Sequence, residues 1–385
     1  MFPQGNDSGP LNRLLAINML YTFVVSAMAV LVPLYLLEQN VDIALIGLIL
    51  SLGPLSFMVI RIFLASVADE IGTRAISVLY AASNVAAMGF YLFFVSPAGF
   101  ALATLSEGIR ASGFWAITRT EVLSVNNSDP GKALARFSNM RQLADGAGRV
   151  AVALLLAYLA FSGTLAFFLV VSLLLLALVA GNRKGKEKAL HIGKSNTDKI
   201  FRKRPRTFWY AAILQALVWL TYNTATGFLL PVYLNSSLEF SYQDTGLLMA
   251  LLSIVTALFA IAFFRLGMSK RTLLLISLLQ VPALLALPFF GKDVLLPLLL
   301  IAVATGPASI VAEYILVDQV FRSKNVSTDI GVLYAPLKVC EFAFLSLGGI
   351  VIANYGFFPL FAVLGLSTFL FVVLGRNALS PEPAH

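Results

Sequence analysis

Long apolar runs recur along the whole chain and leave only short polar connections between them. Most of these runs reach the roughly 20 residues that an α-helix needs to cross the hydrocarbon core of a bilayer. The composition agrees, because 59% of the 385 residues are hydrophobic and only 12% are charged. A soluble globular domain does not carry that balance. The sequence therefore predicts an all-α polytopic membrane protein.

The runs define twelve expected transmembrane spans. They cover residues 12–37, 43–66, 75–95, 99–123, 138–160, 163–181, 207–234, 244–264, 272–290, 295–320, 331–354 and 357–375. The first run is too long for a cleavable signal peptide and lacks a small-residue cleavage site, so we expect it to remain as a span. The connections are too short to hold a soluble catalytic domain, and we therefore expect a protein that is not an enzyme.

Basic residues gather on one side of the expected membrane. The connection at 183–206 alone holds ten Lys and Arg residues, whereas the connections on the other side hold Lys292 beside several acids. Because cytoplasmic connections carry the excess of Lys and Arg, we expect both termini in the cytoplasm and the protein in the cell membrane. The net charge of +8 is then explained by contact with anionic membrane lipids and requires no nucleic acid.

The basic connection separates two halves that resemble each other. The string LVPLYLLEQNVDIALIGLILSL in the first half aligns with LLPVYLNSSLEFSYQDTGLLMALLS in the second. The alignment pairs Pro33 with Pro231, Tyr35 with Tyr233, and Gly47 with Gly246. We therefore expect a six-helix bundle at 1–182, a basic linker at 183–206 and a second six-helix bundle at 207–385. Such a parallel repeat is typical of one large class of transporters.

The connection between the second and third spans carries a short charged motif. The pattern Gly-x-x-x-Asp-(Arg/Lys)-x-Gly-(Arg/Lys)-(Arg/Lys) marks this loop in the major facilitator superfamily. Here Asp69, Gly72 and Arg74 match the pattern, whereas Ala65, Glu70 and Thr73 depart from it. Together with the twelve spans, the repeat and the charge bias, this motif makes the whole chain resemble that superfamily.

The resemblance implies a twelve-helix fold in two pseudo-symmetric halves and a gate on the cytoplasmic face. Gly72 permits a tight turn, and Asp69 beside Arg74 would accept hydrogen bonds from a facing helix end. Family likeness makes Arg119 and Glu121 of the fourth span, and Arg141 of the fifth, the partners of Asp69 in that gate. The alternative is that these charges only mark the membrane edge.

Six ionisable residues lie deep within the expected spans, where charge is costly and often marks a pathway. They form three pairs at helical spacing: Glu107 with Arg110, Asp145 with Arg149, and Lys338 with Glu341. Residues three or four positions apart share a helix face, so each pair can be a neutralised structural pair. The alternative is a polar cavity between the halves, in which the cations attract an anionic or strongly polar solute and an acid exchanges protons.

Polar uncharged residues accompany these charges on the first and seventh spans. They are Asn18, Tyr21, Trp219, Tyr222 and Asn223. The resemblance places both spans beside the cavity, so these side chains would contact the solute; hydrogen bonds between helices are the alternative.

These features predict a secondary active transporter that moves a small polar or anionic organic solute by alternating access, coupled to protons. A passive uniporter and a drug-efflux antiporter stay open as alternatives, and a sensor or lipid flippase is the least expected. Both histidines, His191 and His385, lie outside the spans, so we expect neither a metal site nor a cofactor. We expect a monomer.

Overall fold

The computed structural model describes residues 8–71, 73–125, 130–181, 202–266, 270–320 and 326–378, and every regular element in them is a helix. The first half contains α1 (Ser8–Glu38), α2 (Ile43–Ile71), α3 (Thr73–Phe93), α4 (Pro97–Val125) and α5 (Pro130–Ala180). The backbone of α5 leaves the helical conformation at Ala160, with φ at 52°, so α5 consists of two arms at 130–159 and 161–180. Those arms correspond to two of the expected spans.

The second half begins with four consecutive helical elements that follow one another without a break, and continues with five further helices and a short turn. Its elements are α7 (Arg206–Thr224), the π-helix η1 (Ala225–Leu229), α8 (Leu230–Val232), the π-helix η2 (Tyr233–Ser237), α9 (Tyr242–Leu266), α10 (Lys270–Ala286), the 3₁₀ turn η3 (Leu287–Phe289), α11 (Leu295–Val320), α12 (Val326–Tyr355) and α13 (Phe358–Ala378). The π turns flank Pro231, whose ring cannot fit an undisturbed α-helix because it clashes with the carbonyl four residues earlier.

Each of the twelve expected spans overlaps one helical segment of this structure. Among the described residues, ten helices are long and apolar enough to cross a membrane, with both arms of α5 counted as one. Helix α4 is not among the ten, and it carries Glu107 and Arg110 near its middle. The all-helical membrane fold predicted from the sequence is confirmed.

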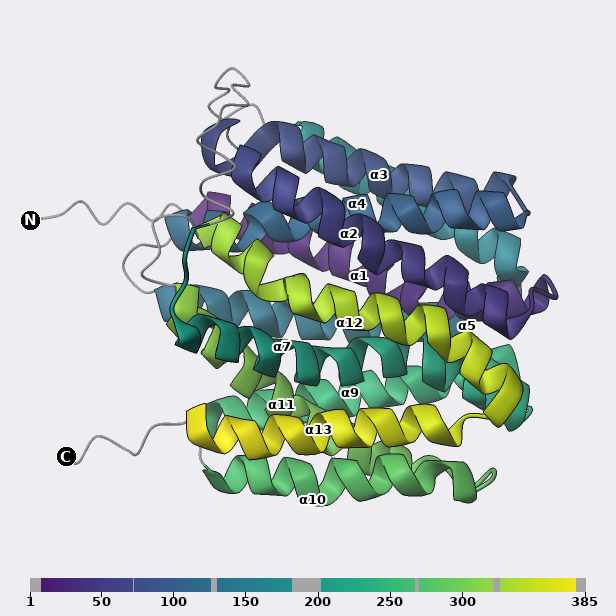
Figure 1. The fold of residues 1–385 in the computed structure, drawn as a ribbon. Coiled ribbons are helices and arrows are strands. Elements are labelled where there is room, and N and C mark those ends of the chain that lie inside the picture. The colour runs from purple at the N-terminus through teal and green to yellow at the C-terminus, as the bar shows by residue number, and fades with distance from the viewer. Residues whose placement is uncertain are drawn as a thin grey trace, which may run out of the picture.

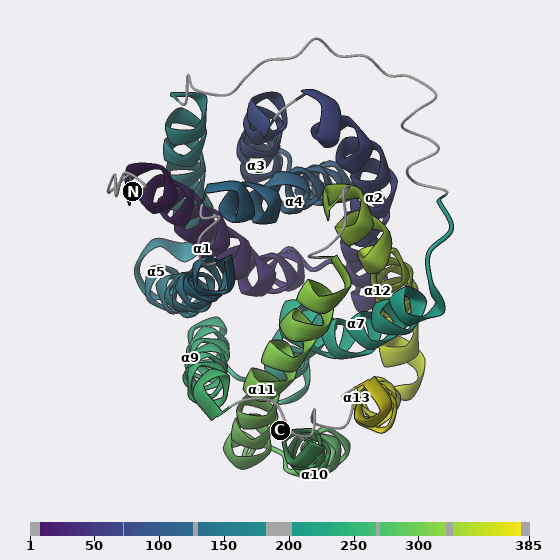
Figure 2. The same ribbon diagram turned by 90° about the vertical axis from the view of Figure 1, so that its left-hand side faces the viewer.

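The helices run alongside one another, and α1 begins at the same end of the molecule where α13 finishes (Figure 1). We call this the termini end and the opposite one the hairpin end. A view onto the termini end separates α1–α5 from α7–α13, with α2 beside α12 and α5 beside α9 where the halves meet (Figure 2).

Matching turns close the first hairpin of each half. Asn40 and Glu239 both adopt a left-handed backbone conformation, with φ values of 56° and 58°. A side-chain oxygen then caps the next helix, because Asp42 accepts a hydrogen bond from the amide of Ala44 at 2.8 Å and Ser241 accepts one from Asp244 at 3.0 Å. Equivalent turns at equivalent places support the internal repeat.

Small residues let the halves approach closely at the hairpin end. A Cβ added to Gly47 of α2 would lie 2.5 Å from the carbonyl oxygen of Leu345 and 3.0 Å from the amide nitrogen of Gly349, both in α12. A Cβ on Gly246 of α9 would lie 3.0 Å from the Cα of Ala153 in α5. The two glycines paired by the sequence repeat therefore lie at the two most extensive contacts between the halves, α2 with α12 and α5 with α9, as small residues commonly do in membrane helix packing.

The buried apolar side chains are distributed unevenly along the molecule. At the hairpin end, one cluster includes residues of both halves, among them Leu34, Leu234 and Ile352. At the termini end, the described residues form one cluster within 15–179 and another within 208–372. Among the described residues, the halves thus share an apolar core at the hairpin end and have separate cores at the termini end.

The described end of the basic linker is attached to α12. Asp329 forms ion pairs of 2.9 Å with both Arg202 and Arg204, and the side chains of Arg204 and Asp329 are only 3% and 5% exposed. The guanidinium of Arg204 also lies over the ring of Phe208, 5.3 Å from its centroid. Besides the expected contact with lipid headgroups, these two linker arginines therefore hold the linker to α12.

Replacing Arg204 with glutamine is expected to destabilise the protein, whereas replacing the neighbouring, exposed Lys203 is not. Breaking a buried ion pair by removing one partner typically costs about 3–5 kcal/mol, and we expect about 2 kcal/mol here because Arg202 still contacts Asp329. Thermal unfolding of the two variants in detergent measures the difference. Equal unfolding temperatures would show that the Arg204–Asp329 pair does not hold the linker to α12.

Candidate functional site

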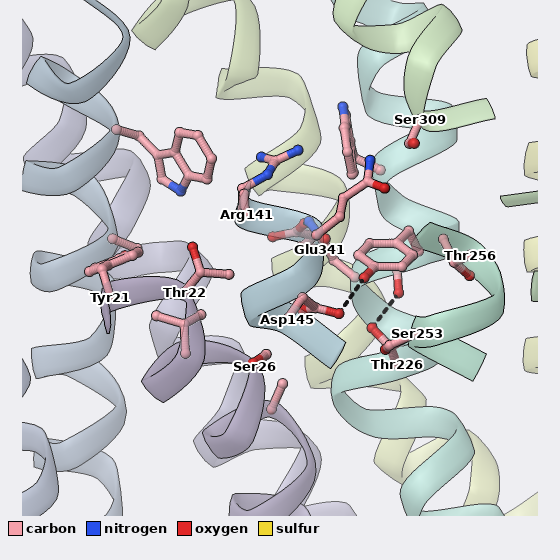
Figure 3. A pocket seen from close by; sticks show the side chains of 18 of the residues that line it. Tyr21, Thr22, Ser26, Arg141, Asp145, Thr226, Ser253, Thr256, Ser309 and Glu341 are labelled. Carbon is pink, nitrogen blue, oxygen red and sulfur yellow. Dashed lines mark hydrogen bonds between the residues drawn. The ribbon is translucent and has the colours of Figure 1, made fainter. Parts of the chain in front are cut away.

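A cavity of about 360 Å³ lies between the halves. Its described lining comes from α1, α2, α4 and the first arm of α5 in one half, and from α7, η1, α9, α11 and α12 in the other. Tyr21, Thr22 and Ser26 approach it from α1, and Ser253 and Thr256 from α9 across the cavity (Figure 3). The remaining lining residues are Val25, Ala29, Phe57, Ala111, Trp115, Arg141, Gln142, Asp145, Arg149, Trp219, Tyr222, Asn223, Thr226, Ala257, Ser309, Tyr334, Leu337, Lys338 and Glu341.

Asp145, Arg149 and Tyr222 form a polar group that joins the two halves across this cavity. The Nε of Arg149 lies 3.3 Å from Oδ2 of Asp145, one helical turn away on α5. Arg149 also donates from Nη2 to the Tyr222 hydroxyl at 3.4 Å, and that hydroxyl donates to Oδ2 of Asp145 at 3.4 Å. Arg149 is 2% exposed, and its Nη1 has no hydrogen-bond partner among the described residues. The guanidinium of Arg149 thus keeps one donor that the described residues do not use.

Lys338, Glu341 and Asn223 form a second polar group within the other half. Lys338 Nζ lies 2.5 Å from Oε2 of Glu341, and Asn223 donates from Nδ2 to Oε1 of the same carboxylate at 2.6 Å. Both oxygens of Glu341 are therefore occupied. Lys338 also lies over the ring of Phe57 of α2, 4.8 Å from its centroid, which brings this cation against the first half.

Arg141 bridges the halves nearer the termini end than Asp145. It pairs with Glu313 of α11 at 3.3 Å, and its guanidinium lies over Trp115 of α4 and Trp219 of α7, at 5.3 and 6.0 Å from the ring centroids. The described partners of Arg141 thus belong to both halves. It lines the cavity with a charge that is paired across the halves.

The expected gate around the loop after α2 is described only in part. Gly72 and the side chains of Asp69, Arg119 and Glu121 lie outside the residues that the structure describes. The side chain of Arg74 is described at the start of α3 and does not line the cavity. The gate assignment therefore stays a prediction. Arg141, the expected gate residue of the fifth span, contacts Glu313, Trp115 and Trp219.

Glu107, Arg110 and Asn18 do not line the cavity and lie inside the first half. Glu107 pairs with Arg110 at 3.5 Å, and Arg110 donates from Nη1 to Asn84 at 2.8 Å. Asn18 donates to the carbonyl oxygen of Phe137 at 3.1 Å. Tyr21 separates this network from the cavity, since its ring faces Arg110 at 6.0 Å and its side chain also lines the cavity.

The serine and threonine residues of the lining, and Gln142, have no distinguishing pattern in the sequence. The hydroxyl residues are Thr22, Ser26, Thr226, Ser253, Thr256 and Ser309. Their signal was weak because Ser and Thr in helices commonly bond to a carbonyl of the preceding turn, as Thr226 does to Tyr222 and Ser309 to Gly306. The helical spacing of Thr22 and Ser26, four positions apart, was the available hint.

The cavity combines three cations, each paired with a carboxylate, with aromatic walls. Arg141, Arg149 and Lys338 supply positive charge, and six aromatic side chains supply apolar surface: Tyr21, Phe57, Trp115, Trp219, Tyr222 and Tyr334. No group of three or more His, Cys, Asp or Glu residues is placed to hold a metal ion within the described ranges. The arrangement therefore offers both charged and aromatic surface to a small solute.

Comparisons with known proteins agree with the helix arrangement. The family model described as Major Facilitator Superfamily matches residues 14–335. Among solved structures, a D-xylose-proton symporter superposes with a TM-score of 0.70 over 96% of each chain, at 12% sequence identity. No curated protein matched the sequence. At this identity, the structural likeness concerns the fold.

Proposed function

Because the chain belongs to the major facilitator superfamily, we propose that it carries a small organic anion through the cavity between its halves by alternating access. The observation that carries this proposal is Arg149, a buried cation whose Nη1 has no hydrogen-bond partner among the described residues. A carboxylate entering the cavity would supply that partner. Arg149 is paired with Asp145 at 3.3 Å, so an entering carboxylate would bind the unused Nη1 or displace Asp145, whereas a neutral solute offers only an uncharged acceptor.

The distribution of apolar contacts supports an alternating mechanism. The halves share a core at the hairpin end and none at the termini end within the described residues. The positive-inside rule makes the termini end cytoplasmic, so this conformer would receive or release solute in the cytoplasm. A rocking motion of the halves would open the other side, as in other transporters built from repeats. We propose a monomer in the cell membrane, in contact with its lipids.

Proton coupling in this proposal rests on Asp145. Its charge is compensated by Arg149, so a solute carboxylate that takes over the guanidinium leaves Asp145 without its cation. A carboxyl group that loses a nearby positive charge binds a proton more readily. Anion and proton would then bind together, because each increases the affinity of the protein for the other. The Tyr222 contact from the other half makes this site sensitive to the motion.

Glu107 and Glu341 are less suited to this role. Glu107 pairs with Arg110 inside one half, so a rigid rotation of the halves leaves that pair unchanged. Glu341 has both oxygens bonded within the other half, to Lys338 and Asn223. A coupling acid must have different proton affinities in the two open states, and a contact across the halves provides such a difference.

We expect Asp145→Asn to retain anion exchange in proteoliposomes but to lose at least about 90% of proton-driven accumulation. Benzoate, which joins a carboxylate to an aromatic body, is the probe for counterflow and for uptake driven by a pH gradient, with the uptake by protein-free vesicles subtracted because neutral benzoic acid crosses a bilayer unaided. Glu107→Gln is the matched control and should accumulate benzoate within about twofold of wild type. Full accumulation by Asp145→Asn would exclude Asp145 as the coupling acid. If the wild type exchanges benzoate without accumulating it, the protein is a passive uniporter.

A further inference from the structure

Another cavity lies on the outer side of the seam between α5 and α9. Its volume is about 380 Å³, and every residue that lines it belongs to one of these two helices. All of the lining side chains are apolar except Gln142. We call this cavity the seam groove. It begins beside the tight Gly246–Ala153 contact, at Leu154, and reaches Ile261 toward the termini end.

The seam groove faces the lipid side of the molecule. Leu143, Leu154 and Leu258 line it and are 52%, 51% and 59% exposed. They belong to segments that are long and apolar enough to span a membrane, so acyl chains surround them in a bilayer. Gly146 of α5 packs closely against α9 within the groove, since a Cβ at this position would lie 3.4 Å from Cγ1 of Ile254.

The groove and the central cavity share a wall. Gln142 of α5 and Ala257 of α9 line both of them. The α9 residue that lines both cavities, Ala257, has only a methyl side chain. On the α5 side, Oε1 of Gln142 is buried and accepts no hydrogen bond from the described residues. A polar atom with unused capacity therefore lies at the boundary between the charged cavity and the apolar groove.

We propose that the transporter accepts amphiphilic carboxylates, whose head binds Arg149 and whose straight alkyl tail passes between Gln142 and Ala257 into the seam groove. This inference rests on the proposed function, because the central cavity must first bind an anion. The tail would then avoid the charged and hydroxyl groups that line the central cavity. It would lie instead on the apolar surface of the seam groove, which is continuous with the bilayer interior. Each methylene removed from water contributes about fourfold to affinity, so chain length should strengthen binding.

Photoaffinity labelling in lipid vesicles tests where the tail lies. The probe is dodecanoate with a diazirine at its terminal carbon, and mass spectrometry locates the labelled residues. We expect labelling of 143–154 and 254–261 in the wild type. Arg149→Gln removes the anchor for the head and Ala257→Leu narrows the passage, so each should reduce this labelling at least fivefold. Ala262→Leu, exposed on the same helix and outside both linings, should leave it unchanged.

Benzoate separates a failure of this inference from a failure of the proposed function. Because benzoate has no tail, it should raise the melting temperature of wild type and Ala262→Leu alike, and a cooperative unfolding transition of Ala257→Leu shows that this variant folds. Equal groove labelling in all variants would mean that the probe reaches the groove from the bilayer alone, and would overturn the inference. If benzoate does not raise the melting temperature of the wild type, or raises that of Arg149→Gln by the same amount, the proposed function fails and the inference falls with it.

Discussion

Replacing Arg149 with glutamine is expected to remove most of the affinity for organic anions while the protein still inserts and folds. Hydrogen bonds to charged groups contribute about 1.5–3 kcal/mol, which corresponds to a loss of about 10- to 150-fold in affinity. The effect should be large because Arg149 lines the cavity, is 2% exposed and keeps an Nη1 donor that no described residue uses. Benzoate binding by calorimetry and benzoate counterflow in proteoliposomes measure it.

A second substitution separates binding from stability. Arg149→Gln leaves the Asp145 carboxylate without its cation, and an uncompensated buried charge destabilises the fold. The double variant Asp145→Asn with Arg149→Gln should therefore regain thermal stability without regaining benzoate binding. Arg149→Lys keeps the positive charge and should bind benzoate with intermediate affinity. Benzoate binding by the double variant at wild-type strength would refute the role of Arg149.

Replacing Gly349 with alanine is expected to loosen the hairpin end. A Cβ at this position would collide with the carbonyl oxygen of Ile43 and would lie 2.8 Å from the Cα of Ala44, so α2 and α12 must move apart. Overpacking of this kind costs about 1–3 kcal/mol, enough to change the ratio of two conformers by about 5- to 150-fold. The conformer that is closed at the hairpin end should lose population to one that is open there.

Spin labels on either side of the seam measure this shift. Gln39 and Asn354 are exposed at the hairpin end of different halves, and each is replaced by cysteine to carry a spin label. The exposed Cys340 is replaced by serine so that it does not react with the label. We expect a longer distance to gain population in Gly349→Ala. Gly89→Ala is the matched control, because no atom lies within 4 Å of a Cβ at that glycine. Identical distance distributions in wild type and Gly349→Ala would show that this contact does not hold the hairpin end closed.

Local sequence was sufficient for the helices and for the pairs within them. Apolar runs of membrane-spanning length predict helices because a lipid environment requires backbone groups to bond within their own segment. Residues three or four positions apart share a helix face, so the pairing of Glu107 with Arg110 and of Lys338 with Glu341 is visible without a structure. The internal repeat likewise identified Gly47 and Gly246, although not what they pack against.

Only the tertiary structure decided which polar residues face the cavity. The pairs Glu107–Arg110 and Asp145–Arg149 look alike in sequence, yet only the second lines the space between the halves. The helices are apolar on almost every side, so no polar stripe indicates how each is rotated about its axis.

The partner of Arg141 illustrates the same limit. Its spacing from Asp145 allowed a pair on α5, but the structure pairs it with Glu313, 172 positions away in the other half. By itself the sequence determined the membrane-spanning helices, their grouping into two related halves and the ion pairs within a helix, because these depend on composition and on neighbours along the chain. The cavity, its cations and its lateral groove depend on packing between segments far apart in sequence, and only the tertiary structure brings those segments together.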